Sequence, residues 1–253
     1  MDAATKANIS LHALLRNLQE LCSMDEVALS AIENKNVAVQ FFVKGLDAAT
    51  FIFQNGTCRY SRSPEEKYKL RIAFSSPERF NRLMNGEKVA PSVNFFGLFY
   101  SGFIFKTFPV LTERLAYYLR PTDEKLFENE QFFRRNTTLM AYTTFYAFAE
   151  IGNGDPDGKS AVSDMGDGCI NIEIKNGSTV HLISQFGKLT AYIGKHTTPS
   201  AEWIFENPRA ANDVLRRKKN TVTAMSERLL TARGKVHQLD AMNRLLAKAE
   251  DYL

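Results

Sequence analysis

Apolar and polar residues alternate along two stretches of the chain that lie far apart, residues 37–74 and 169–205. Each stretch contains three short runs of this kind. Successive side chains of a β-strand point to opposite faces of a sheet, so Ile170, Ile172 and Ile174 would share one face. Each stretch therefore predicts a small antiparallel meander of three strands.

The two stretches follow one pattern, which indicates an internal duplication. Gly45 falls opposite Gly177, and Gly56 opposite Gly187, at an offset of 131 or 132 residues. Glycines at these places suit the turns of hairpins. The tetrapeptide FSSP that closes the first stretch also matches FENP in the second.

Helical periodicity flanks both stretches. Apolar stripes at helical spacing precede them at 11–21 and 139–149, and terminal stripes follow at 111–119 and 242–253. Each half is predicted to run helix, three strands, helix, short helix, strand, helix. The late strands are expected at 102–108 and 234–239. The polar stretch PTDEK marks the boundary, which predicts two domains, residues 1–121 and 122–253.

The segment NFFGLFYSGFIFKTF, residues 94–108, contains six of the chain's 19 phenylalanines. A membrane span is disfavoured because the segment also holds Asn94, Lys106 and two glycines, with Pro109 directly after it. The pattern instead predicts a short amphipathic helix, a switch at Gly102, and a strand with Phe103 and Phe105 on one face. Whether these rings form a filled core or line a cavity stays open.

Taken together, these elements resemble the sterol carrier protein type 2 family. The resemblance covers about residues 8–120 and 135–253 and rests on Phe80, Leu83, Met84, Gly86, Pro91, Phe95, Phe96, Gly102, Phe103 and Phe105. It implies an α+β fold of two tandem repeats, each a mainly antiparallel curved sheet covered by helices around an apolar tunnel. The second copy departs from the pattern, because Arg217 stands near the expected glycine and the segment TAMSERLLTARG is more polar.

The resemblance implies non-catalytic binding or transfer of a fatty acid, acyl chain or sterol-like lipid, mainly in the first repeat. The candidate ligand-binding residues are Phe80, Met84, Phe95, Phe99, Phe103 and Phe105. Two alternatives remain. The chain could be a protein-interaction or self-association module with solid cores, or an enzyme that uses a cofactor in the cavity. Transient membrane contact and the oligomeric state are left open.

Composition narrows the function classes. Charged residues make up 24% of the chain and the net charge is +4, with the densest basic cluster at 216–219. No zinc-ligand spacing or RNA-binding aromatic motif accompanies that cluster, so nucleic-acid binding is not expected. Three widely spaced cysteines and an N-terminal sequence without an apolar run predict a reducing, cytoplasmic location.

Motifs of catalysis and metal binding are largely missing from the sequence. It contains no G-x-S-x-G elbow, P-loop or G-x-G-x-x-G, so no enzyme activity and no cofactor are predicted. His181 and His196 could meet across the second meander, but a metal site is not expected. The stretch NGDPDGKSAVSD, residues 153–164, partly matches a calcium-binding loop and is interpreted as a flexible connection.

Overall fold

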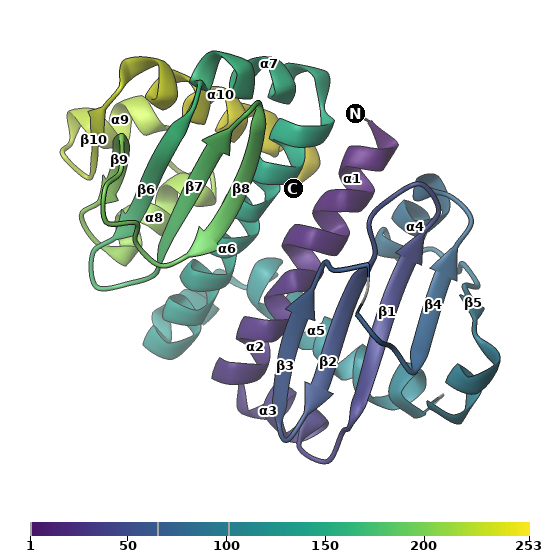
Figure 1. Ribbon diagram of the computed structural model, residues 1–253. Coiled ribbons are helices and arrows are strands. Elements are labelled where there is room, and N and C mark those ends of the chain that lie inside the picture. Colours follow the sequence, from purple (N-terminus) through teal and green to yellow (C-terminus); the bar gives the residue numbers. More distant parts are fainter. Residues whose placement is uncertain (1, 65, 101) are drawn as a thin grey trace. The chain divides into compact units, whose positions relative to one another are not determined.

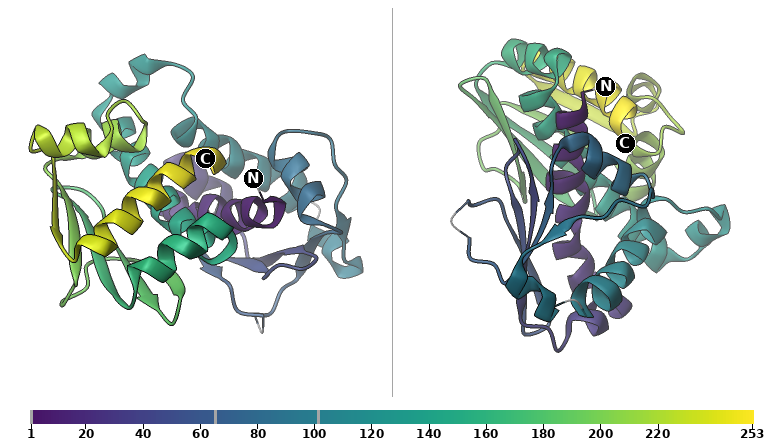
Figure 2. Two further views of the ribbon diagram at one scale, coloured as in Figure 1. Left: turned by 90° about the horizontal axis from the view of Figure 1, so that it is seen from above. Right: turned by 90° about the vertical axis from the view of Figure 1, so that its right-hand side faces the viewer.

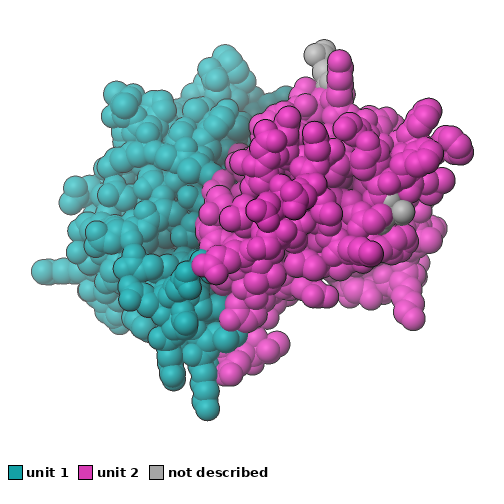
Figure 3. Space-filling model, turned by 90° about the horizontal axis from the view of Figure 1, so that it is seen from below, with its two compact units in different colours: residues 1, 124–253 teal, residues 2–123 magenta. Residues whose placement is uncertain are grey.

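The computed structural model describes residues 2–64, 66–100 and 102–253. Its contacts divide the chain into two compact units, residues 2–123 and 124–253 (Figure 3). Each unit has a five-stranded sheet, and its long helices pack against one face of that sheet (Figures 1 and 2). The predicted fold class, α+β with two units built on one plan, is confirmed.

The first unit begins with one long helical segment and ends with another. Its elements are α1 (Ala3–Ile9), η1 (Ser10–Leu14), η2 (Leu15–Asn17), α2 (Leu18–Met24), α3 (Glu26–Ile32), β1 (Val37–Val43), β2 (Ala49–Gln54), β3 (Thr57–Ser61), β4 (Leu70–Phe74), α4 (Pro77–Met84), β5 (Ser92–Val93), η3 (Phe95–Tyr100), η4 (Phe103–Thr107) and α5 (Phe108–Leu119). The segments η1 and η4 are π-helical, and η2 and η3 are 3₁₀-helical.

The second unit follows nearly the same order. Its elements are η5 (Glu124–Glu128), α6 (Glu130–Gly154), α7 (Pro156–Met165), β6 (Gly168–Ile174), β7 (Thr179–Gln185), β8 (Lys188–Ile193), β9 (Ala201–Phe205), α8 (Pro208–Leu215), α9 (Thr221–Ser226), β10 (Leu230–Gly234) and α10 (Val236–Tyr252). None of the described helices is long and apolar enough to cross a membrane.

The sheets are mixed, with strand orders β3-β2-β1-β4-β5 and β10-β9-β6-β7-β8. The predicted three-strand meander is wrong in one respect, because its third run is two strands in each unit. The fourth strand returns to pair in parallel with the first, β4 with β1 and β9 with β6. In each unit a polar stretch lies between the third and fourth strands in the sequence and includes residues 62–64 and 66–69 in the first unit and 194–200 in the second.

The hairpin turns between β2 and β3 and between β7 and β8 explain one of the two matched glycine pairs. Asn55 and Gly56 have φ values of 52° and 70°, and Phe186 and Gly187 have 52° and 71°. Two-residue turns with positive φ at both positions match the right-handed twist of the strands that they join. The parallel registers agree as well, with Val39 opposite Leu70 in one sheet and Ile170 opposite Ala201 in the other.

The predicted late strands at 102–108 and 234–239 are wrong as well. In the first unit, residues 102–119 are helical throughout, and the fifth strand is the two-residue β5. In the second unit, β10 ends at Gly234 and α10 starts at Val236. Phe103, Thr107, Leu111 and Leu115 are all buried. They are spaced four residues apart, which is the periodicity of a helix. The alternation that predicted a strand at 102–108 does not describe which of these side chains are buried.

The interpretation of residues 153–164 as a flexible connection is also wrong. These residues form the junction of α6 and α7 and most of α7. Asp155 caps α7, with its Oδ1 accepting the backbone N–H groups of Asp157 at 2.9 Å and Gly158 at 3.1 Å. Pro156 takes the first helical position. Aspartate directly before proline is a signal for the start of a helix. Asp155 and Pro156, which were predicted to lie in a flexible loop, are the N-cap and the first residue of α7.

Candidate functional site

The first unit contains an apolar cavity of about 430 Å³ between its sheet and its helices. Of the sixteen lining residues that the structure describes, fourteen have no polar side chain. The lining consists of Leu14, Leu15, Phe41, Ile72, Phe80, Leu83, Met84, Gly86, Pro91, Ile104, Phe108, Thr112, Leu115, Ala116, Leu119 and Arg120. Small-molecule sites in proteins have volumes of about 300–1,000 Å³ and mostly apolar walls, so the size and lining suit a ligand.

The floor of the cavity is the sheet. Phe41 on β1 and Ile72 on β4 lie opposite each other in the parallel register, and both are at most 4% exposed. Residues at alternate positions of a strand share one face, so the buried face of β1 and β4 supplies these side chains to the cavity. The rim includes Gly86, Ala116 and Arg120, which are exposed, so the cavity opens to solvent there.

The short helix α4 supplies one wall. Ser76 caps it and Pro77 occupies its first turn, which fixes where the helix begins. Phe80 is fully buried, and its ring lies 5.1 Å from the ring of Phe74 in an edge-on contact. The ring of Phe80 is therefore held by the core while it also lines the cavity.

Two polar side chains line the cavity. The Thr112 hydroxyl lies within hydrogen-bonding distance of the carbonyl oxygens of Phe108, at 3.1 Å, and Pro109, at 3.0 Å, so its own helix satisfies it. Arg120 follows the last residue of α5 and is exposed at the rim. Within residues 2–64, 66–100 and 102–253, the Arg120 guanidinium forms no hydrogen bond or ion pair.

The structure brings only part of the predicted set together. Phe80 and Met84 line the cavity. Phe103 is 5% exposed and packs on Phe53, with ring centroids 4.9 Å apart, outside the lining. Phe95, Phe99 and Phe105 are 75%, 81% and 77% exposed and lie outside it as well. A ligand-binding role for the six residues stays a prediction.

Sequence reasoning missed the wall that α5 and the preceding turn supply. Ile104, Phe108, Thr112, Leu115 and Leu119 all line the cavity. They follow one another at intervals of three or four residues, which places them on one face of a helix. That signal was present in the sequence, and the strand interpretation of residues 103–105 hid it.

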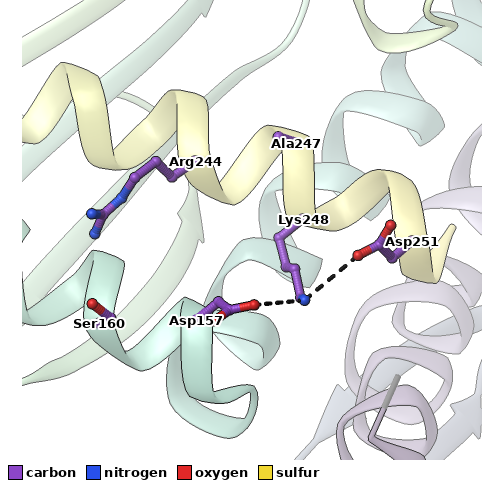
Figure 4. A pocket seen from close by; sticks show the side chains of 6 residues that line it. All are labelled: Asp157, Ser160, Arg244, Ala247, Lys248 and Asp251. Atoms are coloured by element: carbon purple, nitrogen blue, oxygen red, sulfur yellow. Dashed lines mark hydrogen bonds and ion pairs between the residues drawn. The ribbon is translucent and has the colours of Figure 1, made fainter.

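An ion-pair cluster on α7 and α10 lines a second hollow, of about 470 Å³. Figure 4 shows Arg244, Lys248 and Asp251 projecting from α10, with Asp157 and Ser160 on α7. Lys248 Nζ lies 2.9 Å from Asp157 and 3.5 Å from Asp251, and the hydrogen bond to Asp157 raises the pKa of Lys248. These charges neutralise one another, so the hollow offers little to a charged ligand.

Other polar features noted in the sequence are engaged within the fold. His181 and His196 do meet, with ring centroids 5.6 Å apart, but His181 Nδ1 bonds the carbonyl of Gly194 at 2.9 Å. Among the described residues no group of three or more metal-ligating side chains occurs. In the basic cluster, Arg216 and Lys218 pair with Glu124, and the hydrogen bond from Arg216 contributes most to lowering the pKa of Glu124 to about 2.

Comparison with known proteins gives matches only among solved structures. No family model matches, and no curated protein matches. The sterol carrier protein domain 2 of Helicoverpa armigera is 13% identical, with a TM-score of 0.36, over 45% of this chain and 91% of that one. Sterol Carrier Protein 2 from Yarrowia lipolytica is 16% identical, with a TM-score of 0.33, over 44% and 91%.

A third match has a different title. The sec-alkylsulfatase Pisa1 from Pseudomonas sp. is 12% identical, with a TM-score of 0.31, over 58% of this chain and 29% of that one. Sterol carrier protein 2 domains, the family that the sequence resembles, are thus among the solved structures similar to this chain.

Proposed function

We propose that the first unit binds a fatty acid, acyl chain or sterol-like lipid without covalent chemistry. The observation that supports this is the cavity of about 430 Å³ with its almost wholly apolar lining. Water that enters a cavity with apolar walls is in contact with hydrocarbon, which is unfavourable. An apolar ligand displaces that water, so its binding is favoured. Each Å² of apolar surface so buried contributes about 25 cal/mol.

The rim supports an anionic head group on that ligand. Among the described residues of the lining, Arg120 is the one with a formal charge, and it lies where the cavity opens. A guanidinium can bind both oxygens of a carboxylate at once, which makes arginine well suited to a fatty acid. An apolar tail in the cavity with its carboxylate at Arg120 would place each end of the ligand against matching chemistry.

The alternatives are less well supported by this geometry. A self-association module with solid cores does not need a cavity, and here the core of the first unit has one. An enzyme needs a nucleophile, acid–base pair or cofactor site among the lining residues. The polar side chains that the described part of the chain supplies to the lining are Thr112, whose hydroxyl bonds its own helix, and Arg120. Binding therefore fits these residues better than reaction.

The test is a titration of delipidated protein with a fluorescent fatty acid, on the parent and two matched variants. Ala116→Trp places an indole at the rim of the cavity, and Ala247→Trp places one on the terminal helix of the second unit. Both alanines are exposed, so neither change disturbs a core. We expect Ala116→Trp to weaken binding about tenfold or more, which is about 1.4 kcal/mol, and Ala247→Trp to leave it unchanged.

Two outcomes would count against the proposal. One is a delipidated protein that takes up no fatty acid or sterol. The other is an equal loss of affinity in both variants, which would place the ligand elsewhere. Solvent extraction of the protein after incubation completes the test, because a chemically altered ligand would indicate reaction rather than binding.

A further inference from the structure

Four large apolar side chains of the first unit are exposed together just before the cavity wall. Phe95, Phe96, Leu98 and Phe99 are 75%, 71%, 58% and 81% exposed, and we call them the aromatic patch. The rings of Phe95 and Phe96 contact each other at 5.7 Å. Apolar groups gathered on a surface in this way mark sites of interaction with a protein or a membrane.

The fold holds the aromatic patch in a defined orientation. The Asn94 side chain accepts the backbone N–H of Arg71 at 2.7 Å and donates to the carbonyl of Lys69 at 3.2 Å, which ties the segment to β4. Gly97 is buried, and a Cβ there would lie 2.3 Å from Asn94 Oδ1 and 2.8 Å from Leu70. The backbone therefore packs inward at Gly97, and the side chains around it face solvent.

The stretch of chain that carries the aromatic patch is rich in positive charge. Residues 67–108 contain seven Lys and Arg against two Glu, a net charge of +5, while the whole chain has +4. Lys69 shares a hollow with Phe96 and Phe99, and its Nζ lies 5.9 Å from the centre of the Tyr100 ring. Lys106 has no ion pair within the described residues. Anything that covers the rings must also tolerate these cations.

The same segment forms part of the cavity. Pro91, just before β5, and Ile104 and Phe108, just after the aromatic patch, all line it. The chain from 91 to 108 thus presents aromatic rings to the outside and a cavity wall to the inside. A surface that rests on a source of apolar ligands would need both features side by side.

We propose that the aromatic patch docks on an anionic lipid bilayer, with its rings among the acyl chains and Lys69 and Lys106 at the head groups. Apolar rings flanked by cations are the side chains that bind such an interface. A second copy of this chain fits less well, because a symmetric contact would bring two positively charged surfaces together. A bilayer would bind the aromatic patch whether or not the cavity holds lipid.

Vesicle co-sedimentation tests the docking directly. The protein is mixed with vesicles of phosphatidylcholine alone or with 30% phosphatidylserine. We expect binding to the mixed vesicles, and a loss of about tenfold or more in partitioning for Phe99→Asn. Phe186→Asn is the matched control, because that ring is 85% exposed in the second unit, and it should leave partitioning unchanged.

Two further measurements distinguish the contributions. Lys69→Gln and Lys106→Gln should each weaken binding to the mixed vesicles about fivefold and have little effect on phosphatidylcholine alone. In Phe99→Trp, brominated acyl chains should quench the new indole, while Trp203, 1% exposed in the second unit, should stay unquenched.

The inference is overturned if the parent protein does not sediment with either vesicle, or if Phe99→Asn and Phe186→Asn lose binding equally. Light scattering on the same proteins tests whether a second copy of the chain binds the aromatic patch instead. A molar mass that doubles with concentration in the parent and stays monomeric in Phe99→Asn, with no difference in vesicle binding, would assign the aromatic patch to a second copy instead.

Discussion

The two units share a frame and differ in what fills it. In the first, the buried Asn81 side chain on α4 donates to the carbonyl of Ala3 on α1 at 2.9 Å. In the second, the buried Asn212 on α8 donates to Asn136 and Thr137 on α6 at 2.7 and 2.9 Å. Asn81 and Asn212 are 131 residues apart, like the matched turns. A buried amide thus fixes the same helix pair in both units.

A second contact is repeated at the terminal helices. Asp25 caps α3 and accepts the hydroxyl of Tyr118 on α5 at 2.8 Å, and Asp155 caps α7 and accepts that of Tyr252 on α10 at 2.7 Å. A cation four residues before each tyrosine reaches the same carboxylate. Arg114 lies 2.6 Å from Asp25, whereas Lys248 lies 3.7 Å from Asp155.

The units differ in the segment that connects the short helix after the fourth strand to the terminal helix, which is α4 to α5 in the first unit and α8 to α10 in the second. The first has the two-residue β5 and the aromatic patch there, while the second has α9 and the five-residue β10. The walls differ too, since Ile72 corresponds to Trp203 and Phe80 to Ala211 by the same offset of 131. The comparison teaches that buried polar contacts and turns define the frame, and that the frame tolerates different apolar contents.

Removing the capping aspartates should have the largest effect on this comparison. Asp25→Ala leaves Arg114 and Tyr118 without their shared carboxylate, and we expect a loss of about 3–5 kcal/mol in the free energy of unfolding. Asp155→Ala should cost less, because Lys248 keeps Asp157 and Asp251 as partners. Denaturant unfolding of both variants measures the difference. Equal losses would show that the two contacts are energetically equivalent despite their geometry.

The second largest effect should be a difference between the two units in how their stability depends on pH. Burial, followed by the positive charge of Arg62, lowers the pKa of His12 to about 3, and its Nδ1 lies 2.7 Å from the Tyr60 hydroxyl. The unfolded chain takes up this proton near pH 6.5 and the folded chain only near pH 3. Stability is therefore full at neutral pH and falls as the pH drops between these values, by about 2 kcal/mol at pH 5.

The loss at pH 5 should come from the first unit, because His181, His196 and His237 of the second are not buried. Burial alone would raise the pKa of Asp25, but hydrogen bonds from Arg114, the Ala28 N–H and Tyr118 lower it overall. Its stabilisation therefore persists until the pH falls below about 4. Denaturant melts of His12→Gln at pH 7 and pH 5 provide the check. An unchanged pH dependence in this variant would rule out His12 as the cause.

The smallest effect concerns the matched turns. Phe186 has a φ of 52°, a conformation that costs bulky residues about 1–2 kcal/mol, and its counterpart Asn55 adopts the same φ with little strain. Phe186→Asn should raise the free energy of unfolding by about 1 kcal/mol. The reverse change, Asn55→Phe, should lower it by a similar amount. Thermal melts of both variants would contradict this if Phe186→Asn were destabilising.

The local sequence was enough to predict the duplication, most of the strands and the flanking helices. Turns with positive φ need glycine or an equivalent residue, and strand faces need alternation, so both leave marks at fixed positions. It was not enough for residues 103–105, where a short apolar run fits a strand and a helix equally. The helix won because Phe103, Thr107, Leu111 and Leu115 bury one continuous face.

The sequence by itself determined that this chain has two copies of one α+β unit, and that a phenylalanine-rich segment distinguishes the first copy. Only the tertiary structure decided which of those phenylalanines are buried. Phe80 lines the cavity, Phe103 packs in the core, and Phe99 faces solvent. Periodicity tells which side chains share a face, but what that face meets depends on elements brought in from elsewhere in the chain. A cavity is the space that those elements leave between them, so no single stretch of sequence encodes it.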